Sequence, residues 1–249
     1  MRRITWHRRK STDLHQWRVA VFAVWCVLAA AMLLTHRAQA QPVSSAEILL
    51  FETDHLHAVK VPAILVYEFR KASNVETGFV DKVQLDLADR QGGRHAALHF
   101  LSGERQREVP ALDDVHGNPV LLGFLERDIA EMQRLTGGSA SYFRKRIRMA
   151  LAGTAPVAAQ QALVFGGKTL QGRMVRIQPY LNDPLGARFA PYVRKTYTFI
   201  VSDQVPGSVY QLSTSLANPG PTTSALGAGE SKPAPAIDET LTLVKLAQP

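Results

Sequence analysis

Two consecutive helices are predicted in the middle of the chain, where the sequence reads NPVLLGFLERDIAEMQRLTGGSASYFRKRIRMALAG from Asn118 to Gly153. The first helix begins at Asn118-Pro119, because Asn caps a helix well and Pro fits its first position. It ends at Gly137-Gly138, since glycine tolerates the left-handed conformation of a helix C-terminus. At about 100° per residue its apolar side chains share one broad face. They are Val120, Leu121, Leu122, Phe124, Leu125, Ile129, Met132 and Leu135.

Two charged residues interrupt the apolar faces of this helix pair. Asp128 lies within the face of the first helix, and Arg146 lies in the apolar arc of the second, between Tyr142 and Ala150. A buried charge is costly unless it is paired and hydrogen-bonded. We therefore predict that Asp128 and Arg146 approach each other, or that each has a buried polar partner. The remaining alternative is that one of them reaches solvent at the edge of its face. In either case a structural role is expected, not a catalytic one.

The segments on both sides of the helices have the pattern of antiparallel strands. In Asp81–Leu87 the residues Val83, Leu85 and Leu87 face one way and polar residues face the other. Such alternation is typical of strands with one solvated face. Further strands are predicted at 63–70, 95–101, 104–109, 163–165, 170–178, 195–202, 209–215 and 237–246, with a loop at 154–161 and a hairpin turn at Val205–Ser208.

Residues 1–40 have the pattern of a signal peptide. A basic region precedes the apolar run Val19–Leu34, and Ala38-Gln39-Ala40 offers the small residues of a cleavage site. Cleavage after Ala40 would release the protein into the periplasm. The alternative is an inner-membrane anchor formed by residues 19–36, whose 18 residues are at the lower limit for spanning a bilayer.

Removal of this segment changes what the composition implies. The whole chain has a net charge of +8, but seven of its 29 basic residues and one of its 21 acidic residues lie in 1–40. The remainder has a net charge of only +2, which gives no support for nucleic-acid binding. The single cysteine, Cys26, lies in the same segment, so the mature chain has no disulfide, no thiolate nucleophile and no cysteine metal site.

The predicted architecture is α+β. It is a mainly antiparallel, curved sheet or open half-barrel, with a central two-helix insertion (118–153) that covers its apolar face. Residues 41–217 form one β-rich domain. Residues 218–236, rich in Pro, Gly, Ser and Thr, are a flexible linker or long loop. The last segment, 237–249, is a strand that returns to the sheet, followed by a tail.

At this level the chain resembles the LolA/LppX-like periplasmic carriers and similar bacterial domains of unknown function. The features that carry the resemblance are the export signal, the strands at 63–70, 81–87 and 95–101, the central helices and the hairpin at 195–215. In such carriers a curved sheet plugged by helices holds acyl chains. The resemblance therefore implies an acyl-chain or lipoprotein ligand, and it identifies no functional residue.

No catalytic motif is found. The chain has no Gly-x-Ser-x-Gly elbow, no phosphate-binding glycine loop and no His-Glu-x-x-His. His55 and His57 would share one face of an extended segment, whereas His95 and His99 would be about 13 Å apart in a strand and could not hold one ion alone. We expect no metal site and no cofactor. The histidines are expected to be hydrogen-bonded or solvated. The helix start at Gly137–Ser139 has free N–H groups for an anion, but ordinary capping of the helix is the favoured interpretation.

The second helix carries a basic face formed by Arg144, Lys145 and Arg148. It is either a solvated face or a contact for anionic lipid headgroups or an acidic partner.

Three function classes follow from these observations. The first is an exported, non-catalytic envelope protein that binds an apolar or lipid-like ligand. The second is a periplasmic scaffold or assembly factor that binds another protein, and the third is a hydrolase with a dispersed active site. A buried apolar cavity would favour the first, and a filled core with an exposed apolar patch would favour the second.

Overall fold

The computed structural model describes residues 42–153, 155–216 and 234–248. From Val43 onward the chain forms one compact unit. The predicted signal peptide (1–40) and most of the predicted linker (218–236) lie outside the described residues.

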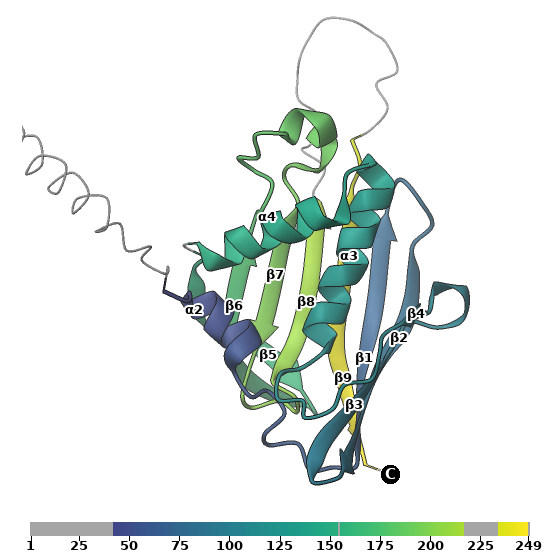
Figure 1. The fold of residues 1–249 in the computed structure, drawn as a ribbon, viewed down its shortest axis with the longest axis vertical. Helices are drawn as coiled ribbons and strands as arrows, with labels where there is room; N and C mark the ends of the chain where they lie inside the picture. The colour runs from purple at the N-terminus through teal and green to yellow at the C-terminus, as the bar shows by residue number, and fades with distance from the viewer. Residues whose placement is uncertain (1–41, 154, 217–233, 249) are drawn as a thin grey trace, which may run out of the picture. The chain divides into compact units, whose positions relative to one another are not determined.

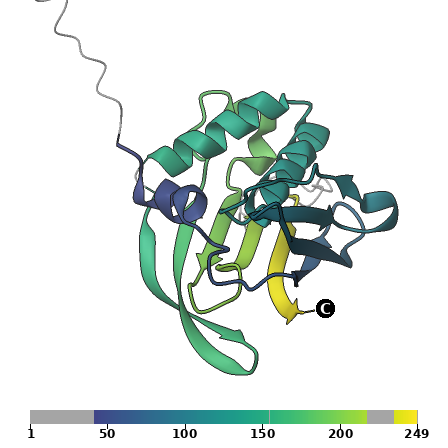
Figure 2. The ribbon, with the colours of Figure 1, turned by 60° about the horizontal axis from the view of Figure 1, so that its bottom comes forward.

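Within the described residues, nine strands form one antiparallel sheet in the order β4-β3-β2-β1-β9-β8-β7-β6-β5. The sheet is curved and unclosed, as predicted (Figures 1 and 2). The strands are β1 (Ala63–Ser73), β2 (Phe79–Arg90), β3 (Gly93–Phe100), β4 (Arg107–Glu108), β5 (Val157–Phe165), β6 (Lys168–Ile177), β7 (Thr196–Val201), β8 (Val209–Leu216) and β9 (Ile237–Ala247).

The last strand of the chain lies in the middle of the sheet. β9 is inserted between β1 and β8, so Leu241 is opposite Phe69 on one side and Leu212 on the other. All three side chains are fully buried. The expected return of this segment to the sheet is thus observed, and it joins the two halves of the sheet.

The helices lie across one face of this sheet (Figure 1). They are α2 (Ser45–Glu47), which continues into the π-helical turn η1 (Ile48–Glu52), α3 (Val120–Thr136) and α4 (Ala140–Ala152). Short 3-10 turns occur at η2 (Gly103–Arg105) and η3 (Gly186–Tyr192).

The predicted helix ends are formed as expected. The Asn118 side-chain oxygen accepts a hydrogen bond from the Val120 N–H at 3.1 Å. Gly137 ends α3 with a φ of 70°, and Ser139 caps α4 by accepting from the Tyr142 N–H. Only three residues separate these helices, and α3 and α4 pack against each other.

Two predicted boundaries were wrong. Residues 154–161 were expected to be a loop, but β5 already begins at Val157 and pairs with β6 across a Gly166-Gly167 turn. Alanine and glutamine are weak strand formers, so this pairing was not visible in the pattern. The expected strand at 104–109 is reduced to two residues, Arg107 and Glu108.

Candidate functional site

Two apolar grooves flank the N-terminal half of α3. The strand-side groove, of about 480 Å³, is bounded by Phe100, Val109, Pro110, Leu112 and Leu122. The helix-side groove, of about 400 Å³, is bounded by Val43, Phe51, Leu122, Leu125, Ile147 and Leu151. Both volumes lie in the range of small-molecule sites, and such sites are predominantly apolar.

Beside the strand-side groove, α3 approaches the sheet closely at Gly123. A Cβ atom on Gly123 would lie 2.7 Å from the Leu98 side chain and 3.0 Å from Phe100. A larger residue at this position would force these side chains to shift. The segment after β4 runs alongside, held to β3 by the bridge between Ala96 and Leu112. It forms the opposite wall of the groove.

The helix-side groove lies between α3, α4 and the α2–η1 segment. Ser44 fixes that segment, because its hydroxyl donates to the Leu151 carbonyl at 2.7 Å. Ser44 and Glu47 also form a capping box at the start of α2. The floor of the groove is therefore made by apolar residues of α3 and α4, and one wall by Val43 and Phe51.

Leu122 is shared by both grooves. The helical pattern placed it on the buried face of α3, but its side chain is 54% exposed. The prediction was wrong at this position because the apolar face of α3 is wider than the surface that the sheet and α4 cover. A helical wheel shows how wide an apolar face is, but not how much of that face the neighbouring elements cover.

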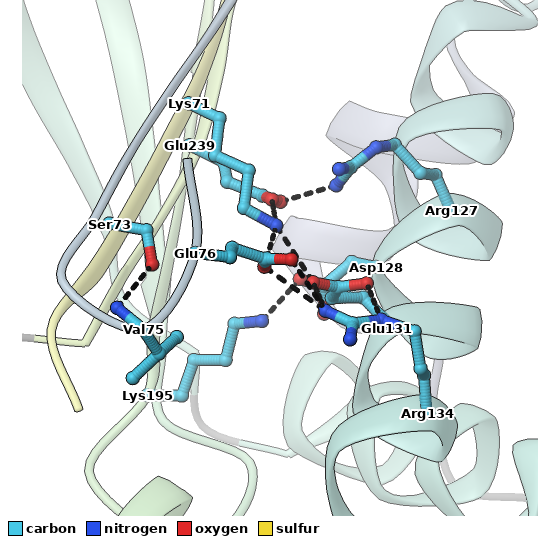
Figure 3. Close-up of polar contacts among 10 residues, drawn as sticks. All are labelled: Lys71, Ser73, Val75, Glu76, Arg127, Asp128, Glu131, Arg134, Lys195 and Glu239. Carbon is cyan, nitrogen blue, oxygen red and sulfur yellow. Dashed lines mark hydrogen bonds and ion pairs between the residues drawn. The ribbon is translucent and has the colours of Figure 1, made fainter. Parts of the chain in front are cut away.

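The C-terminal half of α3 buries Ile129 and Met132, and it also meets the sheet through charged side chains (Figure 3). At the centre is Lys71 of β1, whose side chain is 3% exposed. Its ammonium lies 2.6 Å from Glu76, 2.7 Å from Glu131 and 3.2 Å from Glu239. Burial alone would lower the pKa of Lys71, but the hydrogen bonds that its ammonium donates to Glu131 and Glu76 raise it.

Two arginines of α3 extend this cluster. Arg127 contacts Glu239 at 2.6 Å, and its guanidinium lies over the Phe69 ring. Arg134 pairs with both Glu131 and Glu76. Burial acts to raise the pKa of Glu131, but hydrogen bonds from Arg134 and Lys71 outweigh it and hold that pKa well below the usual range. We call this cluster, formed by Lys71, Glu76, Arg127, Glu131, Arg134 and Glu239, the ionic seam.

Asp128 has a buried polar partner other than Arg146. Its carboxylate accepts hydrogen bonds from the Lys195 ammonium and, at 2.5 Å, from the Tyr197 hydroxyl. The side chains of Asp128 and Lys195 are 1% and 3% exposed. Burial raises the pKa of Tyr197 well above its ordinary value, and the neighbouring Asp128 charge adds to the effect. Tyr197 therefore remains a proton donor to Asp128.

Arg146 pairs with Asp183, with 2.8 Å between guanidinium and carboxylate. The Asp183 side chain is fully buried and also accepts from the Tyr142 hydroxyl. The direct Asp128–Arg146 pair was therefore wrong, and the alternative of separate buried partners is observed. Asp183 and Lys195 both come from the segment that joins β6 to β7, and each of them pairs with a different charge of the two helices.

The three residues of the predicted basic face of α4 differ in their contacts. Arg144 is bound to Glu126 of α3 through two hydrogen bonds, at 2.6 and 2.8 Å. Lys145 and Arg148 are exposed, and neither has an ion pair with another residue in the described ranges. The part of the basic face that remains available is thus Lys145 and Arg148.

His55 and Asn118 together join the start of α3 to η1, to β1 and to the turn at Gly207. The His55 ring is 2% exposed; Nδ1 accepts from the Asn118 N–H at 3.3 Å, and Nε2 is 2.9 Å from the Leu49 carbonyl. The Asn118 amide in turn donates to the Tyr67 hydroxyl and the Gly207 carbonyl. This pattern requires a neutral ring that donates through Nε2. Burial lowers the pKa of His55 below 6.5.

The stability of the protein is expected to depend on His55 in mild acid. The unfolded chain binds a proton at higher pH than the folded one, so stability is complete above about pH 6.5 and is lost as pH falls below it. The loss is at most about 1.4 kcal/mol per pH unit. Urea unfolding followed by circular dichroism between pH 7 and 5 measures it. The pH-dependent part should be absent in His55→Gln, and an unchanged slope in that variant would refute the assignment.

The histidines of the described part of the chain do not gather with other ligand side chains into a metal site. No three His, Cys, Asp or Glu side chains gather there to hold an ion. His55 and His57 have separate partners, since the His57 ring contacts the Asp54 carbonyl at 2.7 Å. Within the same residues, no helix is long and apolar enough to cross a membrane.

Comparisons with known proteins give similarity only in structure. No protein-family model matches the chain, and no curated protein matches it in sequence. The fold is similar to the lipoprotein LppX of Mycobacterium tuberculosis, at 12% identity over 73% of this chain and 85% of that chain, with a TM-score of 0.29. A LolA superfamily protein of Nitrosomonas europaea is 11% identical over 83% of this chain and 94% of that chain, with a TM-score of 0.23. Both solved structures come from the group of proteins that the chain was predicted to resemble.

Proposed function

We propose that this is an exported, non-catalytic envelope protein that binds an apolar or lipid-like group in the grooves beside α3, and that its mature N-terminus follows Ala40. The observation that supports this proposal is the exposed Leu122 between two apolar grooves of ligand size. An apolar surface of this kind is costly to leave in water unless it has a partner.

The grooves proposed as the binding site are separate from the space between α3 and the sheet. Between α3 and the sheet, Phe69, Phe100 and Phe124 are each at most 1% exposed, and the ionic seam occupies the other half of the helix. An acyl chain would meet charges there. The grooves offer apolar contact without separating the ionic seam.

Replacing Leu122 with glutamine is expected to weaken the binding of a fluorescent fatty acid about tenfold, because the amide removes apolar contact in both grooves. The measurement is a titration with dansyl-undecanoic acid followed by fluorescence. Val164→Gln is the matched control, since Val164 is 60% exposed on β5 and lines neither groove. Equal affinities in both variants, or no binding to the wild type, would reject the grooves as a lipid site and favour the scaffold alternative.

A further inference from the structure

The outer surface of α4 combines cationic and apolar side chains. The helix has four basic residues and no acidic residue between Ala140 and Ala152. Two of the four are neutralised, Arg144 by Glu126 and Arg146 by Asp183. Lys145 and Arg148 remain, one turn apart on the same side of the helix. Met149, 51% exposed, lies one turn after Lys145.

The α2–η1 segment adds apolar residues beside this helix. Val43 is 49% exposed and Phe51 is 39% exposed, and both line the helix-side groove together with Arg148. The acidic residues that line the same groove are Glu47, which is held in the capping box, Glu126, which pairs with Arg144, and Glu52 next to Phe51. We call the surface formed by Val43, Phe51, Lys145, Arg148 and Met149 the docking face.

We propose that the docking face binds the surface of an anionic lipid bilayer. Exposed apolar side chains beside Lys and Arg are the combination that inserts shallowly into the headgroup region and attracts anionic lipids. The position of the face in the chain agrees with this partner, because Val43 follows the apolar run Val19–Leu34 by nine residues. Before any cleavage after Ala40, that link spans at most about 30 Å, which keeps the face near a bilayer that holds the run. This inference goes beyond the proposed function and does not require a ligand in the grooves.

The test is flotation of the protein, purified from the envelope of its producing cell, with two kinds of vesicle. One contains phosphatidylcholine alone, and the other contains about 30 mol% phosphatidylglycerol. The wild type is expected to float with the anionic vesicles at low salt, and to do so less at about 0.5 M salt. Lys145→Gln with Arg148→Gln should weaken partitioning about 25-fold, from about fivefold per cation. Met149→Ser should weaken it at either salt concentration.

The matched control is Arg90→Gln with Lys168→Gln, which removes the same charge from two exposed turns away from α4. It should partition as the wild type does. Equal loss in the two double variants would show that only net charge matters and would overturn the docking face. Wild-type protein that binds neither vesicle, or both equally at all salt concentrations, would also overturn it. If the fatty-acid probe still binds in solution, that failure leaves the proposed function standing.

Discussion

Replacing Lys71 with methionine is expected to lower the free energy of unfolding by about 3–5 kcal/mol. The ammonium of Lys71 is the common partner of Glu76, Glu131 and Glu239. Without it, Glu239 keeps Arg127 alone, although its side chain has no exposed surface. Uncompensated charge in a buried position is the main cost of breaking such a cluster. Urea unfolding at pH 7, followed by far-UV circular dichroism, measures the change.

The adjacent residue of the same strand is the matched control. Arg70 also pairs with a glutamate, Glu68, but their side chains are 61% and 45% exposed on the other side of β1. Exposed pairs contribute about 0–1 kcal/mol, so Arg70→Met should be nearly neutral. Similar losses of unfolding free energy in Lys71→Met and Arg70→Met would mean that the buried ionic seam stabilises the fold no more than an exposed ion pair does.

The ionic seam also shows how many inward-facing residues the alternation of side chains along a strand can predict. The residues Leu65, Tyr67 and Phe69 were predicted to share one face of β1, and all are fully buried. One further step of the same alternation leads to Lys71, but the predicted strand ended at Arg70. The same step in β9 leads from Leu241 back to Glu239, which is 1% exposed. Charged residues at inward positions of two strands were thus the available signal for the ionic seam.

The partners of these inward charges could not be read from the chain. Lys71 and Glu239 become neighbours only because β9 is inserted beside β1, far from its own position in the sequence. Local patterns determine which face of a strand is buried, but strand order depends on the whole sheet. For the same reason Asp128 and Arg146 were recognised as buried charges, whereas Lys195 and Asp183 were not.

The grooves could not be predicted from the sequence for a similar reason. Their walls come from α2–η1, from α3 and α4, and from the segment after β4, and of these elements only α3 and α4 were predicted. The exposure of Leu122 depends on the gaps between them. Amphipathic patterns predict that an apolar face will be covered, but they do not tell how completely. The part of such a face that remains uncovered is where a binding surface forms.

Replacing Lys195 with methionine is expected to cost about 3–5 kcal/mol at pH 7, because it leaves the buried Asp128 carboxylate with the Tyr197 hydroxyl as its remaining hydrogen-bond donor. That carboxylate can then be neutralised by taking up a proton. The folded variant therefore binds a proton that the unfolded chain releases, and its deficit relative to the wild type should shrink as pH falls from 7 to 5. Unfolding curves at several pH values measure this trend.

The double variant Asp128→Asn with Lys195→Met distinguishes a charge effect from a packing effect. It removes both charges and keeps an oxygen that can accept from Tyr197, so most of the stability lost in Lys195→Met should return. The two substitutions must then be strongly non-additive, as expected for residues in direct contact. Additive losses with no pH trend would instead mean that Lys195 stabilises α3 through its aliphatic chain, and that the buried charge of Asp128 has another source of compensation.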